Sequence, residues 1–407
     1  GNALKLTYGV NSQYYEFNPG TIVPTSSNSG VIARQLDKKF AIESAVYFDV
    51  DQKISDKFSI NYGLRHSHFI RLGEQLINIY ANNQAVVYNS DAKIYEKATP
   101  IGTKFYGKNK TIANFNNLEP RLALTFAFDE NQSFKASYNR MSQYLHLISN
   151  TSSPTPLDIW APSDNFFKPQ ILDQFAIGYF KNFNDDNYSI EIESFYKKMK
   201  NRVDYIDGAE LIANNDLEQI ILNGIGRSYG LEFFLRKNTG KLQGWVSYTI
   251  SRAEQQTPGR NANETGINDG KWYKSGFDKL HNLSVTATYK KNERWSYGAI
   301  FTLQSGQPST FPDGKFDYQG ISVPNFGLRN ENSLPVFHHL DVSATYVPKP
   351  NKQKGWQGEW VFSIYNLYNR QNAASINFRQ NADTAASEAV QFSIFGVMPG
   401  ITYNFKF

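Results

Sequence analysis

Two histidines in this sequence have a spacing that could bind a metal ion. His66 and His68 are separated by one residue, so both side chains share a face if the segment is extended. Imidazole is a common zinc ligand, but a structural zinc site uses about four ligands, and no third ligand is apparent nearby. We therefore interpret the pair as polar aromatic residues at a strand end. The sequence predicts no metal site and no cofactor.

Acid–base chemistry has candidate groups but no recognisable motif. Hydrolysis needs a nucleophile, a base and a group that orients the base. The side chains that could act as a base or an orienting acid are His146, His281, His339, Asp278 and Asp341. None of them stands in a recognisable arrangement with a nucleophile. The sequence therefore predicts no catalytic residues and no enzyme.

Composition narrows the class of protein that could carry these residues. The 407 residues include 42 Lys and Arg against 37 Asp and Glu, and no cysteine. The small basic excess contains no run of Lys or Arg, which argues against a nucleic-acid partner. The absence of cysteine excludes disulfides and thiol catalysis. Mean hydropathy is −0.51, and no apolar run approaches the roughly 18 residues of a spanning helix.

Apolar residues instead recur at every second position, which is typical of strands with one apolar and one polar face. The clearest example is the end of the sequence, where Ile401, Tyr403, Phe405 and Phe407 alternate with Thr402, Asn404 and Lys406. Runs of this kind begin at Leu4–Phe17 and recur along the chain. They predict about fourteen strands, of which the last two are expected at 358–379 and 388–407.

Short and long connections alternate between the predicted strands. Tight polar turns are expected at 51–57, 129–132, 184–187, 238–241, 291–293 and 348–358, and the longer segments at 18–38, 71–116, 147–171, 202–224, 254–280, 305–335 and 380–387. Membrane β-barrels sort their connections in this way, with short turns on the periplasmic side and long loops outside. The predicted fold class is therefore all-β, a transmembrane antiparallel β-barrel.

Several motifs resemble those of one family of such barrels, the TonB-dependent receptors. They include "NLEPRLALTFAFDENQSFKASYNR" (117–140), "IGRSYGLEFFLRKNTGKLQGWVSYTISRAE" (225–254) and "WVFSIYNLYNRQNAASINF" (360–378). The resemblance covers nearly the whole chain and implies a barrel of about 22 strands with a plug in its lumen. With about fourteen strands, residues 1–407 are expected to be the C-terminal portion of that barrel, without the plug and the first strands. A complete, smaller barrel with a similar wall is the alternative.

Alternation and loop composition predict the functional residues. The side chains expected to face the lumen are Glu43, Arg65, Glu119, Arg121, Glu191, Glu193, Glu232, Arg236 and Asp341. The aromatic residues expected to bind substrate in the long loops are Trp160, Phe166, Phe167, Trp272 and Tyr273. Loop-on-loop packing is an equal alternative for these rings. Tyr403, Phe405 and Phe407 resemble the assembly signal of outer-membrane barrels.

The resemblance implies high-affinity uptake of a scarce nutrient across the outer membrane, of the siderophore, vitamin, glycan or peptide class. The expected partners are outer-membrane lipid, the missing plug and strands, TonB acting through that missing part, and the barrel-assembly machinery. A surface lipoprotein is a further candidate partner. A passive porin-like channel and a structural barrel subunit of a surface assembly are the alternative functions.

Overall fold

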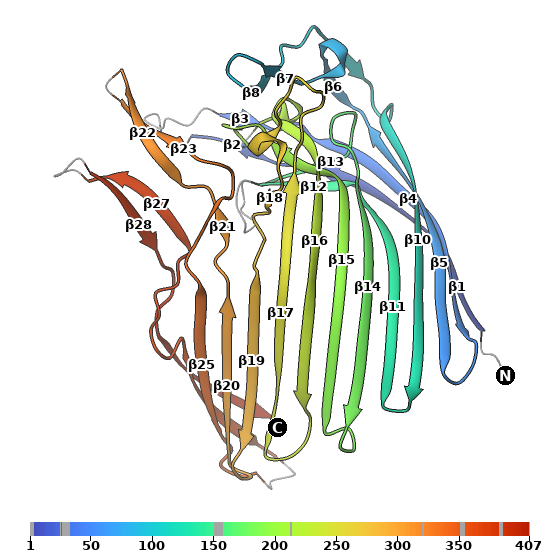
Figure 1. The fold of residues 1–407 in the computed structure, drawn as a ribbon, viewed down its shortest axis with the longest axis vertical. Helices are drawn as coiled ribbons and strands as arrows, with labels where there is room; N and C mark the ends of the chain where they lie inside the picture. Colours follow the sequence, from blue (N-terminus) through green and yellow to red (C-terminus); the bar gives the residue numbers. More distant parts are fainter. Residues whose placement is uncertain are drawn as a thin grey trace.

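The computed structural model of the chain is almost entirely β-structure (Figure 1). It describes residues 4–24, 26, 33–149, 158–211, 214–319, 321–350, 355–381 and 386–406. Within these ranges the helical segments are three short 3-10 turns, Ala81–Asn83, Leu217–Gln219 and Ile267–Gly270. No helix in these ranges is long and apolar enough to cross a membrane.

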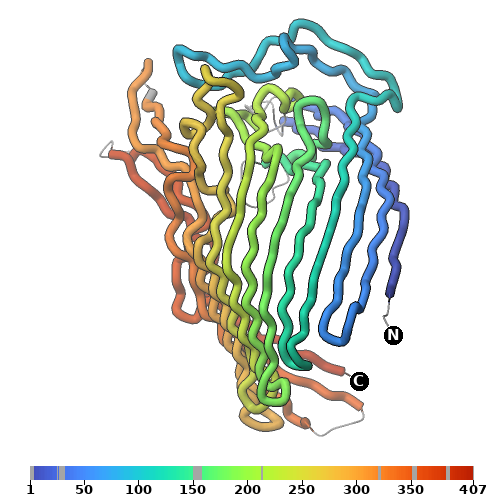
Figure 2. The backbone as a smooth tube through the Cα atoms, turned by 45° about the vertical axis from the view of Figure 1, so that its right-hand side comes forward, coloured from blue at the N-terminus to red at the C-terminus, as the bar shows by residue number. Residues whose placement is uncertain are grey.

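One long antiparallel sheet forms a curved wall (Figure 2). Fourteen strands follow one another in it: β1 (Leu4–Phe17), β4 (Lys39–Lys53), β5 (Phe58–Leu72), β10 (Thr111–Asp129), β11 (Gln132–Gln143), β14 (Gln170–Phe183), β15 (Tyr188–Tyr205), β16 (Ile221–Lys237), β17 (Leu242–Gln256), β19 (His281–Lys290), β20 (Trp295–Gln304), β25 (Phe337–Tyr346), β26 (Gln357–Tyr365) and β29 (Met398–Lys406). The short strand β18 (Tyr273–Lys274) pairs with β17 beside this path. The predicted strand number and fold class are confirmed.

The register gives the wall two chemically different faces. Paired residues of an antiparallel sheet lie on the same face, so a face can be followed from strand to strand. Leu124 on β10 faces Ala136 on β11 and Ile60 on β5, whereas its neighbour Thr125 faces Lys135 and Ser59. The apolar face leaves many large side chains open to the surroundings, including Val10, which is 77% exposed. An apolar face of this extent is typical of a wall that contacts lipid.

Smaller hairpins lie outside the wall, and all of them belong to the long connections. Their pairs are β2 (Thr21–Ile22) with β3 (Arg34–Gln35), β6 (Gln75–Ile79) with β9 (Gly102–Tyr106), β7 (Val86–Asn89) with β8 (Ile94–Lys97), β12 (Leu145–Ile148) with β13 (Ile159–Pro162), β21 (Pro308–Ser309) with β24 (Asn332–Ser333), β22 (Pro312–Tyr318) with β23 (Ile321–Phe326), and β27 (Ser375–Gln380) with β28 (Ser387–Phe392). Most gather beyond one end of the wall, opposite the short turns (Figure 1). The predicted alternation of short and long connections is confirmed.

The last part of the chain departs from the sequence prediction. The expected strands 358–379 and 388–407 are each divided, because β26 ends at Tyr365 and β29 begins at Met398. Asn366 and Asn369 follow β26 with φ of 53° each, a left-handed conformation that ends a strand. The intervening β27 and β28 pair with each other and leave the wall. The final long connection is therefore 366–397, and 380–387 is only its tip.

The first and the last strand of the wall, β1 and β29, each pair with one other strand. β1 pairs with β4, β29 pairs with β26, and no described residue of β1 pairs with β29. The described wall is thus an open sheet with two edge strands.

The main apolar core lies in the long connections and the strand ends beside them. It includes Ile148, Ile159, Phe167, Leu217 and Ile220, each at most 3% exposed. These residues come from separate loops, so the loops pack on one another as a layer across that end of the wall.

Candidate functional site

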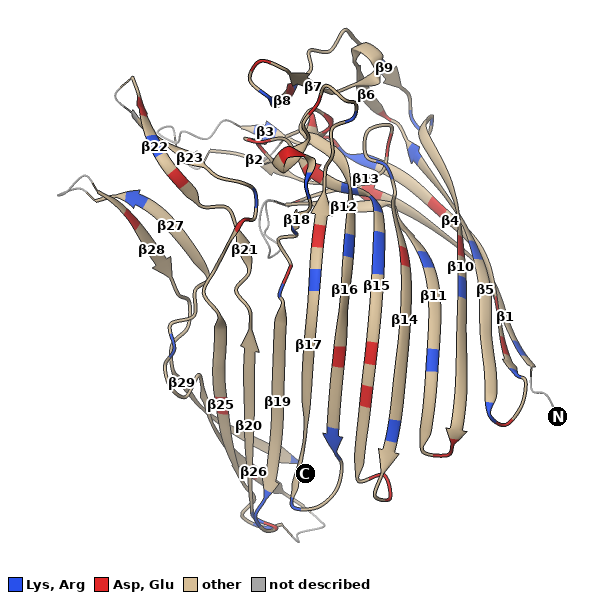
Figure 3. Cartoon of the chain, viewed as in Figure 1, with Lys and Arg blue, Asp and Glu red and all other residues tan. Residues whose placement is uncertain are grey.

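The register brings the nine charged residues expected in the lumen onto one face of the wall. Arg65 lies opposite Glu119 on the neighbouring strand, Glu193 faces Glu232, and Asp341 shares their face through β20. Figure 3 shows the charged bands along these strands. We call this the inner face. Its exposure to a water-filled lumen remains a prediction.

Arg65 joins two acids of the inner face. Its guanidinium lies 3.1 Å from Glu43 and 3.5 Å from Glu119, and all three side chains are partly or largely shielded from solvent. The Ser67 hydroxyl donates to Glu119 over 2.5 Å and lies 2.7 Å from the hydroxyl of Tyr144. Buried charges need such partners. The network connects β4, β5 and β10 to Tyr144, which follows β11 at the beginning of a long connection.

The other inner-face charges are spread along the wall. Arg121 forms an ion pair with Asp49, and Asp341 accepts from the backbone amide of Asn366 over 2.9 Å. Glu191, Glu193, Glu232 and Arg236 form no ion pair within the described part of the chain. Among the described residues, no group of three or more His, Asp or Glu side chains could hold a metal ion.

A buried carboxylate ties three separate segments together at the loop end of the wall. Asp204 is 2% exposed and accepts from Thr257 over 2.6 Å, from Arg329 over 2.6 Å and from the hydroxyl of Tyr273. A bulge at Asn201, with φ of 55°, shifts the register of β15 by one residue. Because one extra residue reverses which face a side chain takes, Asp204 turns to the inner face.

Further polar contacts connect the loop layer. Glu264 binds Arg260 over 2.8 Å and accepts from Tyr95 over 3.2 Å, which joins connection 257–280 to hairpin β7–β8. Burial raises the pKa of Glu264, but the hydrogen bonds from Arg260 outweigh it, so the net pKa is lowered. Tyr80 donates to Glu218 over 2.9 Å, joining 73–110 to 206–220. The loops thus hold one another through side chains far apart in sequence.

The three aromatic residues expected from 157–169 have different environments. Trp160 on β13 is 50% exposed. Phe166 is partly buried, with its ring 5.7 Å from that of Tyr80 in an edge-on contact. Phe167 is 1% exposed and stacks on His146 at 6.2 Å. Trp160 is therefore the ring of the three that a ligand could reach without opening the loop layer.

The two aromatic residues expected from 266–277 separate to opposite sides. Tyr273 is 7% exposed and accepts from Gln255 over 2.9 Å. Burial first, and then Asp204, raises its pKa. Trp272 lies 4.2 Å from the guanidinium carbon of Arg227, which is on the outward face of β16. Tyr273 contributes to loop packing in this structure, and Trp272 lies beside the outward face.

The candidate base His339 lies 2.8 Å from Asp341 but has no hydroxyl partner among the described residues, whereas a hydroxyl but no acid lies beside the buried His146. Its ring nitrogens lie 2.9 Å from the Ser163 hydroxyl and 3.0 Å from the Gln170 amide. Burial first, and the nearby Arg202, lower the pKa of His146 to about 4. An amide takes the place that an orienting carboxylate would have. The geometry fits a buried structural histidine.

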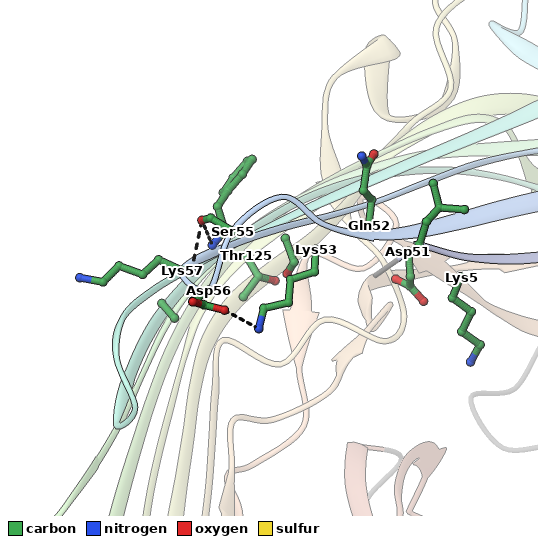
Figure 4. Close-up of a pocket in the computed structure, with 12 residues that line it drawn as sticks. Lys5, Asp51, Gln52, Lys53, Ser55, Asp56, Lys57 and Thr125 are labelled. Carbon is green, nitrogen blue, oxygen red and sulfur yellow. Dashed lines mark hydrogen bonds and ion pairs between the residues drawn. The ribbon is translucent and has the colours of Figure 1, made fainter. Parts of the chain in front are cut away.

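A cleft of about 370 Å³ lies at the short-turn end of the inner face (Figure 4). It is lined by residues of β1, β4, β5, β10 and turn 54–57, including Lys5, Asp51 and Thr125. Lys53 and Asp56 form an exposed ion pair of 2.9 Å beside it. The cleft is next to β1, an edge strand of the described wall.

The C-terminal aromatic residues expected as an assembly signal lie on the outward face. Phe405 stacks on Trp356 at 4.5 Å, and Tyr403 lies 4.6 Å from Trp360. Phe407 lies outside the described residues. The role of these rings in assembly remains a prediction.

Sequence reasoning missed the residues whose side chains connect the loops, above all Asp204, Arg329 and Glu264. A bulge and partners more than 100 residues away decide their positions, and neither leaves a periodic signal. A charged residue near a strand end was the one local hint at Asp204.

Solved structures similar to this chain are receptors and transporters. The ferric-catecholate import receptor Fiu from E. coli K12, in its closed form, has a TM-score of 0.60 and 15% identity, covering 99% of this chain and 52% of that one. The ferric preacinetobactin receptor BauA from Acinetobacter baumannii has a TM-score of 0.58 and 15% identity, covering 99% and 52%. The copper transporter OprC has a TM-score of 0.57 and 10% identity, covering 99% and 53%. This chain spans about half the length of these proteins. None of the curated protein sequences matches it.

The sequence itself matches a family model. The family described as "TonB dependent receptor-like, beta-barrel" matches residues 1–367. This range covers every wall strand up to and including β26. The wall is that of an outer-membrane β-barrel, and the chain belongs to the family of TonB-dependent receptor-like β-barrels.

Proposed function

We propose that this chain is the C-terminal portion of a TonB-dependent transporter that takes up a scarce nutrient across the outer membrane. The observation that carries the proposal is an open wall of fourteen strands with a charged inner face. Unpaired backbone groups cost several kcal/mol each in hydrocarbon, so the edges β1 and β29 need partners. Further strands of the same receptor, accompanied by a plug, would supply them.

A metal chelate is the substrate class that the similar structures favour. They are a ferric-catecholate import receptor, a ferric preacinetobactin receptor and a copper transporter, and vitamins, glycans and peptides are the other classes compatible with this family. Trp160 offers an exposed ring in the loop layer, and an aromatic face can stack on the aromatic rings of such chelates. The inner-face network around Arg65 would then line the path below.

The proposed partners are those that the wall requires. TonB would act through the plug, because energy from the inner membrane must reach the path that the plug closes. The C-terminal strand would be read by the barrel-assembly machinery, and a surface lipoprotein could cover the loop layer. We propose no enzymatic role, since His146 pairs with an amide rather than an acid, and His339, which pairs with Asp341, has no hydroxyl partner in the described part of the chain.

Uptake measurements test the proposal. The receptor that contains this chain is expressed in a Gram-negative host that lacks its own iron-chelate receptors, and accumulation of labelled ferric chelates is followed with and without a protonophore. The proposal predicts saturable accumulation that stops when the proton gradient collapses. Accumulation that is linear in concentration and insensitive to the protonophore would establish a passive channel instead.

A further inference from the structure

A row of ionised side chains crosses the apolar, outward face of the wall near its loop end. Each member lies directly opposite the next in the strand register, so the row is continuous across six strands. In order from β11 to β18 its members are Arg140, Asp173, Lys198, Arg227, Glu254 and Lys274. Figure 3 shows blue and red bands at similar height on the upper parts of β11, β14, β15, β16 and β17. We call these six residues the outward charged row.

The row directly below it is aromatic. Tyr138, Phe175, Tyr196 and Tyr229 lie opposite one another, each two residues from a member of the charged row and on the side of the short turns. Aromatic girdles of membrane barrels lie at the boundary between hydrocarbon and headgroups. The outward charged row therefore lies at headgroup level in the outer leaflet.

The carboxylates of the row are already paired. Asp173 accepts from Arg140 over 2.7 and 3.0 Å and from the Tyr138 hydroxyl over 2.8 Å. Glu254 accepts from Arg227 over 2.8 Å. Both carboxylates of the row are therefore already paired with an arginine.

Two lysines beside these pairs add further positive charge to the surface. Lys198 belongs to the row, and Lys200 lies two residues further toward the loops on the same face. Both are exposed, and neither forms an ion pair within the ranges that the structure describes. With Lys200 included, five cations stand against two carboxylates, so this surface has an excess of three positive charges.

A cleft of about 300 Å³ opens at this point of the outward face. It is lined by Tyr138, Arg140, Asp173, Phe175, Tyr196 and Lys198. The side of the cleft toward the loops is charged, with Arg140 and Lys198, and the side toward the short turns is aromatic. A ligand that fits has an anionic group joined to an apolar body, in the orientation of a lipid in the outer leaflet.

We propose that this cleft binds a phosphorylated glycolipid of the outer leaflet. Lys198 and Lys200 would hold a phosphate group, Arg140 would add a donor from its pair with Asp173, and the rings of Tyr138, Phe175 and Tyr196 would contact the sugar and upper acyl chains. Arg binds phosphate through its planar set of donors, and Lys binds it as a compact charge. The bound lipid would seal the receptor against its membrane beside the loop layer.

Binding of defined lipids to the purified receptor tests this inference. The receptor in detergent is titrated with bis-phosphorylated lipid A and with the same lipid after removal of its phosphates, and bound lipid is counted by native mass spectrometry. The double variant Lys198→Gln and Lys200→Gln should bind the phosphorylated lipid roughly thirtyfold more weakly, since each of the two basic residues at a membrane surface contributes about 1 kcal/mol. The dephosphorylated lipid should bind the wild type and this variant equally.

A matched variant controls for charge alone. Lys135→Gln with Lys197→Gln removes two positive charges from the inner face of the neighbouring strands β11 and β15 and should leave lipid binding unchanged. Lys198→Arg with Lys200→Arg should retain binding, and heat-modifiable migration shows that each variant is folded. Equal binding of the two lipids by wild type, an equal loss in the inner-face variant, or no loss in Lys198→Gln with Lys200→Gln would each overturn the inference. Displacement of the lipid by millimolar inorganic phosphate would also overturn it, because the cleft would then be a site for free phosphate.

Discussion

Asp204 and Arg329 form an ion pair of 2.6 Å although they are 125 residues apart in sequence. Their side chains are 3% and 19% exposed, so the pair is largely withdrawn from water. It joins the end of β15 to the connection between β20 and β25, and Tyr273 and Thr257 bind the same carboxylate. The position of the loop layer over the wall depends on this contact.

Asp204→Asn should loosen the loop layer. Removing one partner of a buried ion pair costs roughly 3–5 kcal/mol, here in the docking of segments 257–273 and 327–331. Hydrogen exchange of those segments should accelerate while the wall strands stay protected. Asp207→Asn is the control, because Asp207 binds the same arginine but is 71% exposed. Its effect should stay below about 1 kcal/mol, and equal effects of the two variants would disprove the role of Asp204.

Trp160 and Phe167 should respond differently to substitution by alanine. Trp160 is half exposed, so Trp160→Ala should weaken apparent substrate affinity in uptake assays and leave loop protection unchanged. Phe167 is buried, so Phe167→Ala should cost about 3–5 kcal/mol in packing and expose the loops to protease. Unchanged affinity in Trp160→Ala would remove this ring from the proposed site.

Leu124→Arg and Thr125→Arg compare the two faces of β10 at neighbouring positions. Leu124 lies on the apolar face, where an arginine near the membrane midplane costs about 2–4 kcal/mol. Thr125 lies on the inner face, where water can hydrate the guanidinium. Folding titrations in lipid vesicles should show the loss only for Leu124→Arg. The same destabilisation in both variants would mean that the facing of the strand is assigned wrongly.

Acid should release hairpin β12–β13 through His146. The pKa of His146 is about 4 in the folded chain, below the ordinary value of 6.5, because burial disfavours the charged ring. The folded state therefore binds this proton less readily than the open state. The stability that His146 contributes is complete above pH 6.5 and falls as the pH drops toward 4, by up to about 3 kcal/mol.

The fluorescence of a receptor whose other tryptophans are replaced would follow Trp160 on β13 during this titration. His146→Gln removes the titrating ring and should flatten the response between pH 6.5 and 4. A response that persists in that variant would assign the pH dependence to another group.

The wall could be predicted from the sequence because its signal is local. Alternation within ten residues identifies strands such as β17, whose residues Val246, Tyr248 and Ile250 lie on one face. The division of the last two predicted strands was missed because β27 and β28 also alternate, and only their partner distinguishes a hairpin from a wall strand.

The loop layer could not be predicted for a different reason. The bulge at Asn201 turns Asp204 inward. Its partner Arg329 is 125 residues away in sequence and reaches it only when the chain has folded. The burial of Phe167 and Tyr273 likewise depends on loops that meet only in the folded chain.

Crosslinking across the two edges of the wall tests most directly whether the wall is open. The sequence contains no cysteine, so introduced pairs are the only thiols in this chain. In the receptor assembled in outer membranes, Val10→Cys with Val46→Cys should crosslink with a short bifunctional thiol reagent, since these residues are opposite each other on β1 and β4.

Cysteines at Leu6, Val10 or Tyr14 on β1, combined one by one with cysteines at Ile401, Tyr403 or Phe405 on β29, should give no crosslink, because further strands separate the two edges. Efficient crosslinking of any β1–β29 pair, at the level of the Val10–Val46 control, would show a closed barrel of fourteen strands and contradict the account.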